Sequence, residues 1–263
     1  AGSEGTLAIV LDMTLETFPR PPARSAVLLL FPRLEPAFEA ALEILRFHPT
    51  ICDLMDRRHL SLARESDHQL EELIPEDTEA AILVELEGQD CRETQNELRT
   101  ILESLRNYHH FDFSTRWATD NAQIVTLWRL VRGSQAVVHR TTSRFRPLPV
   151  ADDLYIASEW MASCVSRLQT ILRQEEVATS FCCRVGDGVI HLQPFFDMQD
   201  PHLLGRMKRV ADHVYGQVLD CGGGIGPTRG CGLSRTPYMR QQWGDAYPIL
   251  ESIKRAFDPF FTT

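Results

Sequence analysis

The sequence has no long hydrophobic run, so a membrane-spanning helix is not predicted. Its apolar stretches, such as residues 25–31, are far shorter than the about 20 residues that a helix needs to cross a bilayer. The first ten residues contain no basic segment followed by an apolar one, so we expect no secretory signal peptide. They are instead typical of the interior of a domain.

Basic residues are in short supply. The chain of 263 residues has 27 Lys and Arg against 36 Asp and Glu, which gives a net charge of −9 at pH 7. Nucleic-acid binding usually needs a concentrated basic face, so this class of partner is not expected. Hydrophobic residues at 43% and charged residues at 24% are typical of a globular protein, and they argue against disorder, collagen and coiled coil.

Closely paired cysteines are also missing. The seven cysteines are an odd number and contain no C-x-x-C pair, which favours reduced thiols in a cytoplasmic protein over a disulfide framework. Zinc sites usually contain ligand pairs two to four residues apart. The conceivable soft ligands here lack that spacing, and we predict no metal site from Cys182 or Cys183, His191, Cys221 and Cys231.

Strand and helix patterns alternate along the chain. Apolar segments predict strands at residues 7–15, 25–31, 51–55, 80–86, 153–157, 177–185 and 189–195. Apolar residues at helical spacing predict helices around residues 34–48, 98–105, 124–131, 161–172 and 207–218. Helices over one face of a largely antiparallel sheet make an α+β sandwich, and the doubled β-α-β pattern predicts a duplicated ferredoxin-like fold. A basic, proline-containing segment after Arg140 divides the chain into halves of approximately 23–139 and 140–263.

A hairpin around residues 182–191 is the first candidate for chemistry. A two-residue turn at Asp187-Gly188 would place Arg184 directly opposite His191. Opposed residues have Cβ atoms about 5 Å apart, so a cation and an imidazole would share one side of the sheet. The alternative is an ordinary solvated pair, and a three-residue loop would change the register and separate the two side chains.

The second candidate is a glycine-rich segment, residues 221–232, with six glycines in twelve residues. It matches neither of the nucleotide-binding glycine patterns G-x-G-x-x-G and G-x-x-x-x-G-K-[ST]. It contains Arg229, whose guanidinium offers paired donors to a carboxylate or phosphate, so the segment indicates a small-anion site. The alternative is a surface turn with solvated arginines.

With these segments, the chain resembles the C-terminal domain of FAD-linked oxidases of the vanillyl-alcohol-oxidase type. That family includes D-lactate dehydrogenase, glycolate oxidase and D-2-hydroxyglutarate dehydrogenase. The resemblance covers essentially the whole chain. Residues 2–10 are similar to the loop and strand that close the FAD-binding domain, and residues 186–191 are similar to the motif H-x-G-D-G-N-x-H. Residues 221–232 are similar to G-G-x-x-x-G-E-H-G-x-G, and residues 253–259 are similar to I-K-x-x-x-D-P. Residues 146–153 and 191–201 are similar to the subgroup that is fused to an iron–sulfur domain.

The resemblance implies a duplicated ferredoxin-like cap that covers the flavin ring and lines the substrate pocket. Residues 1–22 would be the end of the FAD-binding domain and its connection, and residues 23–263 the cap. FAD would be the cofactor of the full-length protein, bound mostly outside this chain. The residues implied to touch it are Gly2, Ser3, Glu4, Gly5 and Thr6. An iron–sulfur cluster is expected, if anywhere, in a downstream domain.

The departures from the family pattern define the site hypothesis. Arg184 stands in place of the first motif histidine, Val189 in place of the asparagine, and Thr228-Arg229 in place of the loop's Glu-His. In metal-using members the two histidines of the hairpin motif and the loop glutamate bind a divalent ion, and the loop histidine is the expected base. Here only His191 is retained, and one protein ligand does not make a working metal site.

We therefore hypothesise a metal-independent variant that oxidises a small anionic 2-hydroxy acid by hydride transfer to FAD. The predicted substrate-binding residues are Arg146, Arg184, Thr228 and Arg229. His191 is the candidate catalytic proton acceptor, since histidine is the residue type that commonly exchanges protons at neutral pH.

Two alternatives belong to other classes of function. The chain could be a non-catalytic cap that shields the flavin or docks an electron-transfer partner, or an independent ferredoxin-like module that binds a ligand by itself. The other expected partners are an electron acceptor or iron–sulfur domain, with a homodimer left open. The expected location is cytoplasmic, with peripheral contact to the inner membrane left open.

Overall fold

The computed structural model describes residues 4–107, 109–140 and 144–262. The first half contains β1 (Ala23–Phe31), α1 (Leu34–Leu45), β2 (Ile51–Asp56), α2 (Arg57–Ser66), α3 (His68–Leu73), β3 (Ala80–Gly88), α4 (Cys91–Asn107), β4 (Ser114–Ala118) and α5 (Asn121–Arg140). The second half contains β5 (Phe145–Pro147), β6 (Leu154–Tyr155), α6 (Ser158–Gln174), β7 (Thr179–Arg184), β8 (Val189–Asp197), α7 (Leu203–Asp220) and β9 (Gly224–Ile225). Short helices follow it: α8 (Gly232–Arg235), η1 (Thr236–Tyr238), α9 (Met239–Trp243), η2 (Gly244–Ala246) and α10 (Tyr247–Phe257).

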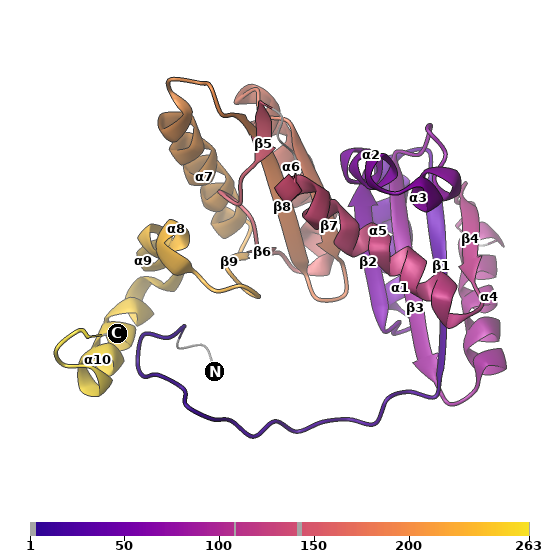
Figure 1. Ribbon diagram of the computed structural model, residues 1–263, viewed down its shortest axis with the longest axis horizontal. Coiled ribbons are helices and arrows are strands. Elements are labelled where there is room, and N and C mark those ends of the chain that lie inside the picture. The colour runs from indigo at the N-terminus through magenta and orange to yellow at the C-terminus, as the bar shows by residue number, and fades with distance from the viewer. Residues whose placement is uncertain (1–3, 108, 141–143, 263) are drawn as a thin grey trace.

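The described strands form one nine-stranded sheet in which each pairing is antiparallel. Its order is β4-β1-β3-β2-β7-β8-β6-β9, and β5 pairs with β8. The order of the first four strands repeats in reverse in the last four, and β2 meets β7 at the centre (Figure 1). Each half has the β-α-β-β-α-β chain order of a ferredoxin-like unit. The predicted duplicated ferredoxin-like α+β sandwich is confirmed.

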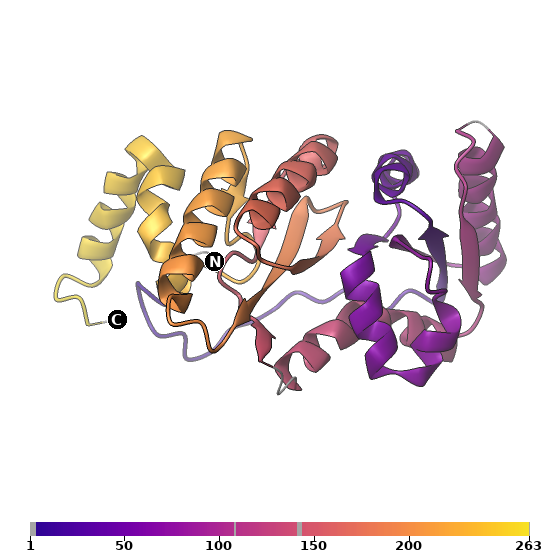
Figure 2. The same cartoon turned by 90° about the horizontal axis from the view of Figure 1, so that it is seen from above.

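Two hydrophobic cores lie on opposite faces of this sheet. The first core lies between the sheet and α1, α4, α6 and α7, which form one row of helices in Figure 2. The second core lies under α2, α3 and α5, on the other face. Among the described residues, Cys182 is the one member of the second core that the second half supplies. On that face β7 and β8 carry the polar residues Ser180, Arg184, His191 and Gln193 beside Cys182 and Val189.

The strand predicted at residues 7–15 does not form. Residues 8–22 have no regular structure, and Ile9, Leu11 and Leu15 are exposed. A strand needs a neighbouring strand to bond its backbone groups, and no described strand pairs with this segment. The segment instead crosses the molecule without regular structure, from the C-terminal helices to the start of β1 (Figure 1). Just before it, the carbonyl oxygen of Thr6 accepts a hydrogen bond from Lys254 Nζ of α10 at 2.6 Å.

The register predicted for the β7–β8 hairpin is also wrong. Arg184 pairs with Val189, and His191 lies opposite Cys182. The turn has four residues, 185–188, because contacts from both sides extend it: Val185 N donates to Cys52 O at 2.9 Å, and Ile156 N donates to Gly188 O at 2.8 Å. The cation and the imidazole therefore occupy diagonal positions on one face.

Candidate functional site

The candidate site gathers residues from three segments of the second half. β8 carries His191, the segment before β6 carries Asp152 and Asp153, and the glycine-rich segment after α7 carries Thr228 and Arg229. The segments meet because β6 pairs with both β8 and β9, and Gly226 N donates to Asp153 O at 2.8 Å. The predicted glycine-rich segment thus lies beside the predicted histidine.

Asp153 binds the glycine-rich segment through hydrogen bonds. Its backbone has φ 63°, in the left-handed region that aspartate tolerates better than most residues. Adjacent side chains in a regular strand point to opposite faces, but this local turn lets Asp152 and Asp153 both reach the segment. The buried Asp153 carboxylate accepts hydrogen bonds from Thr228 Oγ1 at 2.5 Å and from Arg229 N at 2.7 Å. Thr228 is therefore held internally by an acidic side chain.

Asp152 lies between the predicted proton acceptor and a predicted substrate-binding arginine. Its Oδ2 accepts from Arg229 Nη1 at 2.7 Å, and its Oδ1 lies 3.4 Å from His191 Nδ1. Burial raises the pKa of the Asp152 carboxyl, but the His191 ring and then the Arg229 guanidinium lower it more, so this pKa lies below its ordinary value. Asp152 is thus a buried carboxylate that stays ionised at neutral pH.

Arg235 bonds to the backbone of both Asp152 and the glycine-rich segment. Its side chain is buried, and its Nε and Nη2 donate to Asp152 O at 3.2 and 3.0 Å. Its Nη1 donates to Gly230 O at 2.9 Å. Through these bonds Arg235 connects the glycine-rich segment to the Asp152 backbone.

Arg184 lies at the edge of the candidate site. Its Nη2 pairs with Asp187 in the turn at 3.0 Å, and in the sheet it lies opposite Asp53 of β2. Burial raises the pKa of Asp53 to about 6, against the lowering effect of the Arg184 charge. Asp53 contributes a buried acid to the same face as His191.

Arg146 is the one predicted substrate-binding residue that the structure places apart from the others. It lies in β5 opposite Phe196, five residues along β8 from His191. At about 3.3 Å per residue this is roughly 16 Å, and an odd number of residues puts the two side chains on opposite faces.

Two of the residues predicted to touch FAD lie at a separate cavity of about 590 Å³. Glu4 and Thr6 line it together with Tyr155, Gly224 and Trp243. Glu4 Oε2 accepts from the backbone N of Cys231 at 2.6 Å, which joins the N-terminal segment to the glycine-rich one. Gly5 has φ 75° in the turn between Glu4 and Thr6, whereas Gly2 and Ser3 lie outside the described residues.

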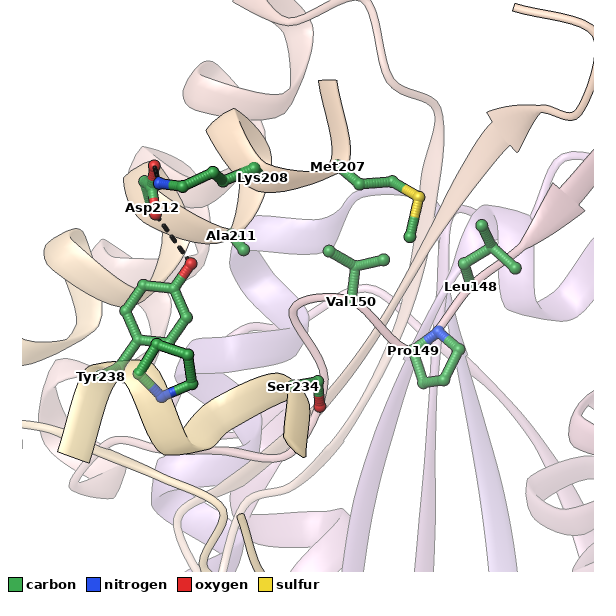
Figure 3. A pocket seen from close by; sticks show the side chains of 10 residues that line it. Leu148, Pro149, Val150, Met207, Lys208, Ala211, Asp212, Ser234 and Tyr238 are labelled. Carbon is green, nitrogen blue, oxygen red and sulfur yellow. Dashed lines mark hydrogen bonds and ion pairs between the residues drawn. The ribbon is translucent and has the colours of Figure 1, made fainter. Parts of the chain in front are cut away.

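The cavity in Figure 3 contains none of the predicted site residues. It has a volume of about 660 Å³ and lies between residues 148–150, α7 and η1. Its lining is largely apolar, and its polar end is internally paired: Asp212 accepts from Tyr238 Oη and from Lys208 Nζ, both at 2.7 Å. No unpaired charge is therefore offered to an ionic ligand by the lining residues shown.

The described residues contain no cluster of three or more His, Cys, Asp or Glu side chains that could hold a metal ion. All seven cysteines are free thiols. Burial, reinforced by nearby negative groups, raises the pKa of both Cys182 and Cys183, so these thiols stay protonated. Their chemistry is that of small core side chains.

Sequence reasoning missed four residues of this site: Asp53, Asp152, Asp153 and Arg235. The signal for Asp53 was present, because an acid inside the apolar stretch of residues 51–55 is unusual for a buried strand. For Asp152 the signal was the acidic pair before a predicted strand. Nothing in the sequence pattern distinguishes Arg235 from its solvated neighbours.

Comparison with known proteins finds a matching family model, and relatives that are dehydrogenases and oxidases by name. A family model described as "FAD linked oxidases, C-terminal domain" matches residues 20–260. D-2-hydroxyglutarate dehydrogenase of Pseudomonas putida is 25% identical over 98% of this chain and 26% of its own length. Glycolate oxidase subunit GlcD of Escherichia coli is 24% identical over 98% of this chain and 50% of its own length.

Solved structures of low sequence identity share the fold. The 4-ethylphenol oxidase from Gulosibacter chungangensis superimposes with a TM-score of 0.63 at 13% identity, over 92% of this chain and 53% of that one. The chain thus spans between about a quarter and about half of the proteins it matches. No helix among the described residues is long and apolar enough to cross a membrane.

Proposed function

Because the chain belongs to the C-terminal domain family of FAD-linked oxidases, we propose that it is the substrate-binding cap of a flavin-dependent enzyme that oxidises a small anionic 2-hydroxy acid. Relatives named for D-2-hydroxyglutarate and glycolate support this substrate class. The observation that carries the proposal is the grouping of His191, Arg229 and Asp152, in which a histidine and a half-exposed arginine share one buried carboxylate.

The chain's own residues fit an edge of the flavin better than the whole cofactor. The 590 Å³ cavity is lined by glycine backbone at Gly224 and by the rings of Tyr155 and Trp243, which suit a flat ring. Lys254 is the cation of its lining, and it is already bonded to Thr6 O and to Asp258. Glu4 and Thr6 would therefore touch the flavin, and a pyrophosphate would bind elsewhere. When bound, FAD supplies the acceptor for the hydride.

The proposed roles follow from the contacts. Only Nη1 of the Arg229 guanidinium makes a hydrogen bond among the described residues, and 42% of the side chain is exposed, so its other edge would take the substrate carboxylate. Arg184 would add a second positive charge at the edge of the site. His191 would accept the proton of the substrate hydroxyl while the hydride leaves the adjacent carbon, which yields a 2-oxo acid. Thr228 would keep Arg229 in place through Asp153.

The test uses the full-length holoenzyme under anaerobic conditions. We expect D-lactate, glycolate or D-2-hydroxyglutarate to bleach the flavin at the same rate with and without a chelator. Arg229→Ala should raise the half-saturating acid concentration by about tenfold to a hundredfold, the range for losing one charged hydrogen bond. Arg46→Ala is a matched control, since Arg46 also has one carboxylate partner at 2.7 Å, Glu43, but lies at the end of α1. An Arg229→Ala enzyme with normal saturation would refute the assignment, and chelator-sensitive bleaching would refute metal independence.

A specific observation favours the second candidate, a non-catalytic cap. Both arginines are already neutralised by carboxylates, Arg229 by Asp152 and Arg184 by Asp187. In that case dithionite would reduce the flavin, but none of the three acids would. The electron acceptor, an iron–sulfur domain, a homodimer, and cytoplasmic or peripheral membrane location stay predictions.

A further inference from the structure

The Asp152 carboxylate is fixed before any substrate arrives. Its Oδ1 accepts from Asp153 N at 2.7 Å and from Leu192 N at 3.1 Å, so it is tied both to its own segment and to β8. Arg235 holds its backbone carbonyl. A side chain that is 3% exposed and anchored at this many points has little freedom to move.

His191 presents one nitrogen to this carboxylate. Nδ1 is buried, forms no hydrogen bond of normal geometry among the described residues, and lies 3.4 Å from Asp152 Oδ1. An ionised carboxylate can only accept hydrogen bonds. If Nδ1 carried no proton, its lone pair would face the lone pairs of Oδ1 in a buried position, which is repulsive. The proton therefore belongs on Nδ1, and Nε2 keeps the lone pair.

The two oxygens of Asp152 serve different partners. Oδ1 faces His191 and the two backbone donors, whereas Oδ2 accepts from Arg229 Nη1 at 2.7 Å. One side chain thereby sets the distance between the histidine on β8 and the arginine of the glycine-rich segment. The two roles can be separated, because they use different atoms.

We infer that Asp152 is a positioning residue that fixes the Nδ1–H tautomer of His191, leaving Nε2 as the proton acceptor, and that it holds one edge of the Arg229 guanidinium. The assignment of Nε2 as the acceptor rests on the proposed function. The tautomer and the contact with Arg229 do not, since they concern the protein without substrate.

Nitrogen-15 NMR of the histidine-labelled full-length protein tests the tautomer directly. Above neutral pH we expect the His191 ring to show a protonated Nδ1 and an unprotonated Nε2. Asp152→Ala should remove that exclusive tautomer, while the exposed His213, which pairs with Glu175 at 3.0 Å, should be unchanged and serves as the internal control. A wild-type ring protonated at Nε2 would overturn the inference even if the alanine variant failed to fold, and so would an alanine variant that keeps the wild-type tautomer.

Asp152→Asn separates the two roles. Its carbonyl oxygen should keep the Oδ1 position, because two backbone N–H groups point there. Its NH₂ group would then face Arg229 Nη1, donor against donor. We expect the wild-type tautomer of His191, with a half-saturating acid concentration raised about tenfold and a kcat that falls less than in Asp152→Ala. Asp152→Ala should lower kcat as well. A loss of the tautomer in Asp152→Asn, or equal kcat in the two variants, would contradict the separation of roles. If no acid is oxidised at all, the NMR results still decide the inference, and the failure belongs to the proposed function.

Discussion

Replacing Asp56 with asparagine should stabilise the protein above pH 7, and the gain should disappear on acidification. Asp56 ends β2 and is the N-cap of α2, where its Oδ1 accepts from His59 N at 2.9 Å. The same oxygen accepts from Phe181 N of β7 at 3.2 Å, across the junction of the two halves. Burial raises the pKa of this carboxyl to about 7 despite both hydrogen bonds.

The raised pKa fixes the sign and the size of the effect. A carboxyl whose pKa is higher in the folded state contributes stability that is complete below the unfolded pKa, near 4, and is lost as the pH rises through 7. The ionised form of Asp56 therefore costs up to about 4 kcal/mol at pH 8. Asparagine is an equally good N-cap and can accept both hydrogen bonds without a charge. The gain in free energy of unfolding should approach that value at pH 8 and fall to about zero near pH 4.

His59 acts in the opposite direction. Burial lowers its pKa to about 4, so it contributes stability above its ordinary pKa of 6.5 that is lost as the pH falls toward 4. In the wild type the two groups offset each other over this window. Asp56→Asn leaves His59 unopposed, so the variant should lose stability on acidification more steeply than the wild type.

The assay is urea denaturation of wild type and variant at roughly pH 5, 6.5 and 8. Asp90→Asn is the matched control, because Asp90 also caps a helix, accepting from Arg92 N at 2.6 Å, but is exposed. The Asp90→Asn control should show the same pH dependence of the free energy of unfolding as the wild type. A free-energy difference between Asp56→Asn and wild type that is the same at pH 5 and pH 8 would refute the reasoning.

Two further predictions concern the hairpin turn and the site. Gly188→Ala should destabilise by more than about 1 kcal/mol, because Gly188 has φ 71° and a Cβ there would lie 2.6 Å from Ile156 O. Gly216→Ala in α7, with no atom within 4 Å of the added Cβ, should stabilise by about 1 kcal/mol, and thermal melting of both variants tests the opposite signs. His191→Gln should raise the pKa of Asp152, since the ring is the largest favourable influence on that carboxylate. Carboxyl carbon NMR measures that change, and an unaltered Asp152 titration would show that the 3.4 Å approach carries no interaction.

Local pattern was sufficient for most of the sheet and its long helices. The strands at β1, β2, β3, β7 and β8 and the helices α1, α4, α6 and α7 follow apolar periodicities that the sequence displays openly. Apolar periodicity did not predict the elements whose side chains are only partly buried. The polar helices α2 and α3, the short strand β4 and the helices after residue 232 were not predicted, because few of their side chains enter the core. Residues 7–15 have strand composition without a partner strand.

The sequence by itself determined the fold class, the glycine-rich segment and the two candidate site residues His191 and Arg229. Only the tertiary structure decided what those residues contact. A hairpin register depends on contacts from neighbouring strands, so Arg184 lies opposite Val189 instead of His191. The role of a charged side chain depends on the opposite charge that it contacts. Asp152 and Arg229 are 77 residues apart in the chain, and they form an ion pair only because the fold brings β6, β8 and the glycine-rich segment together.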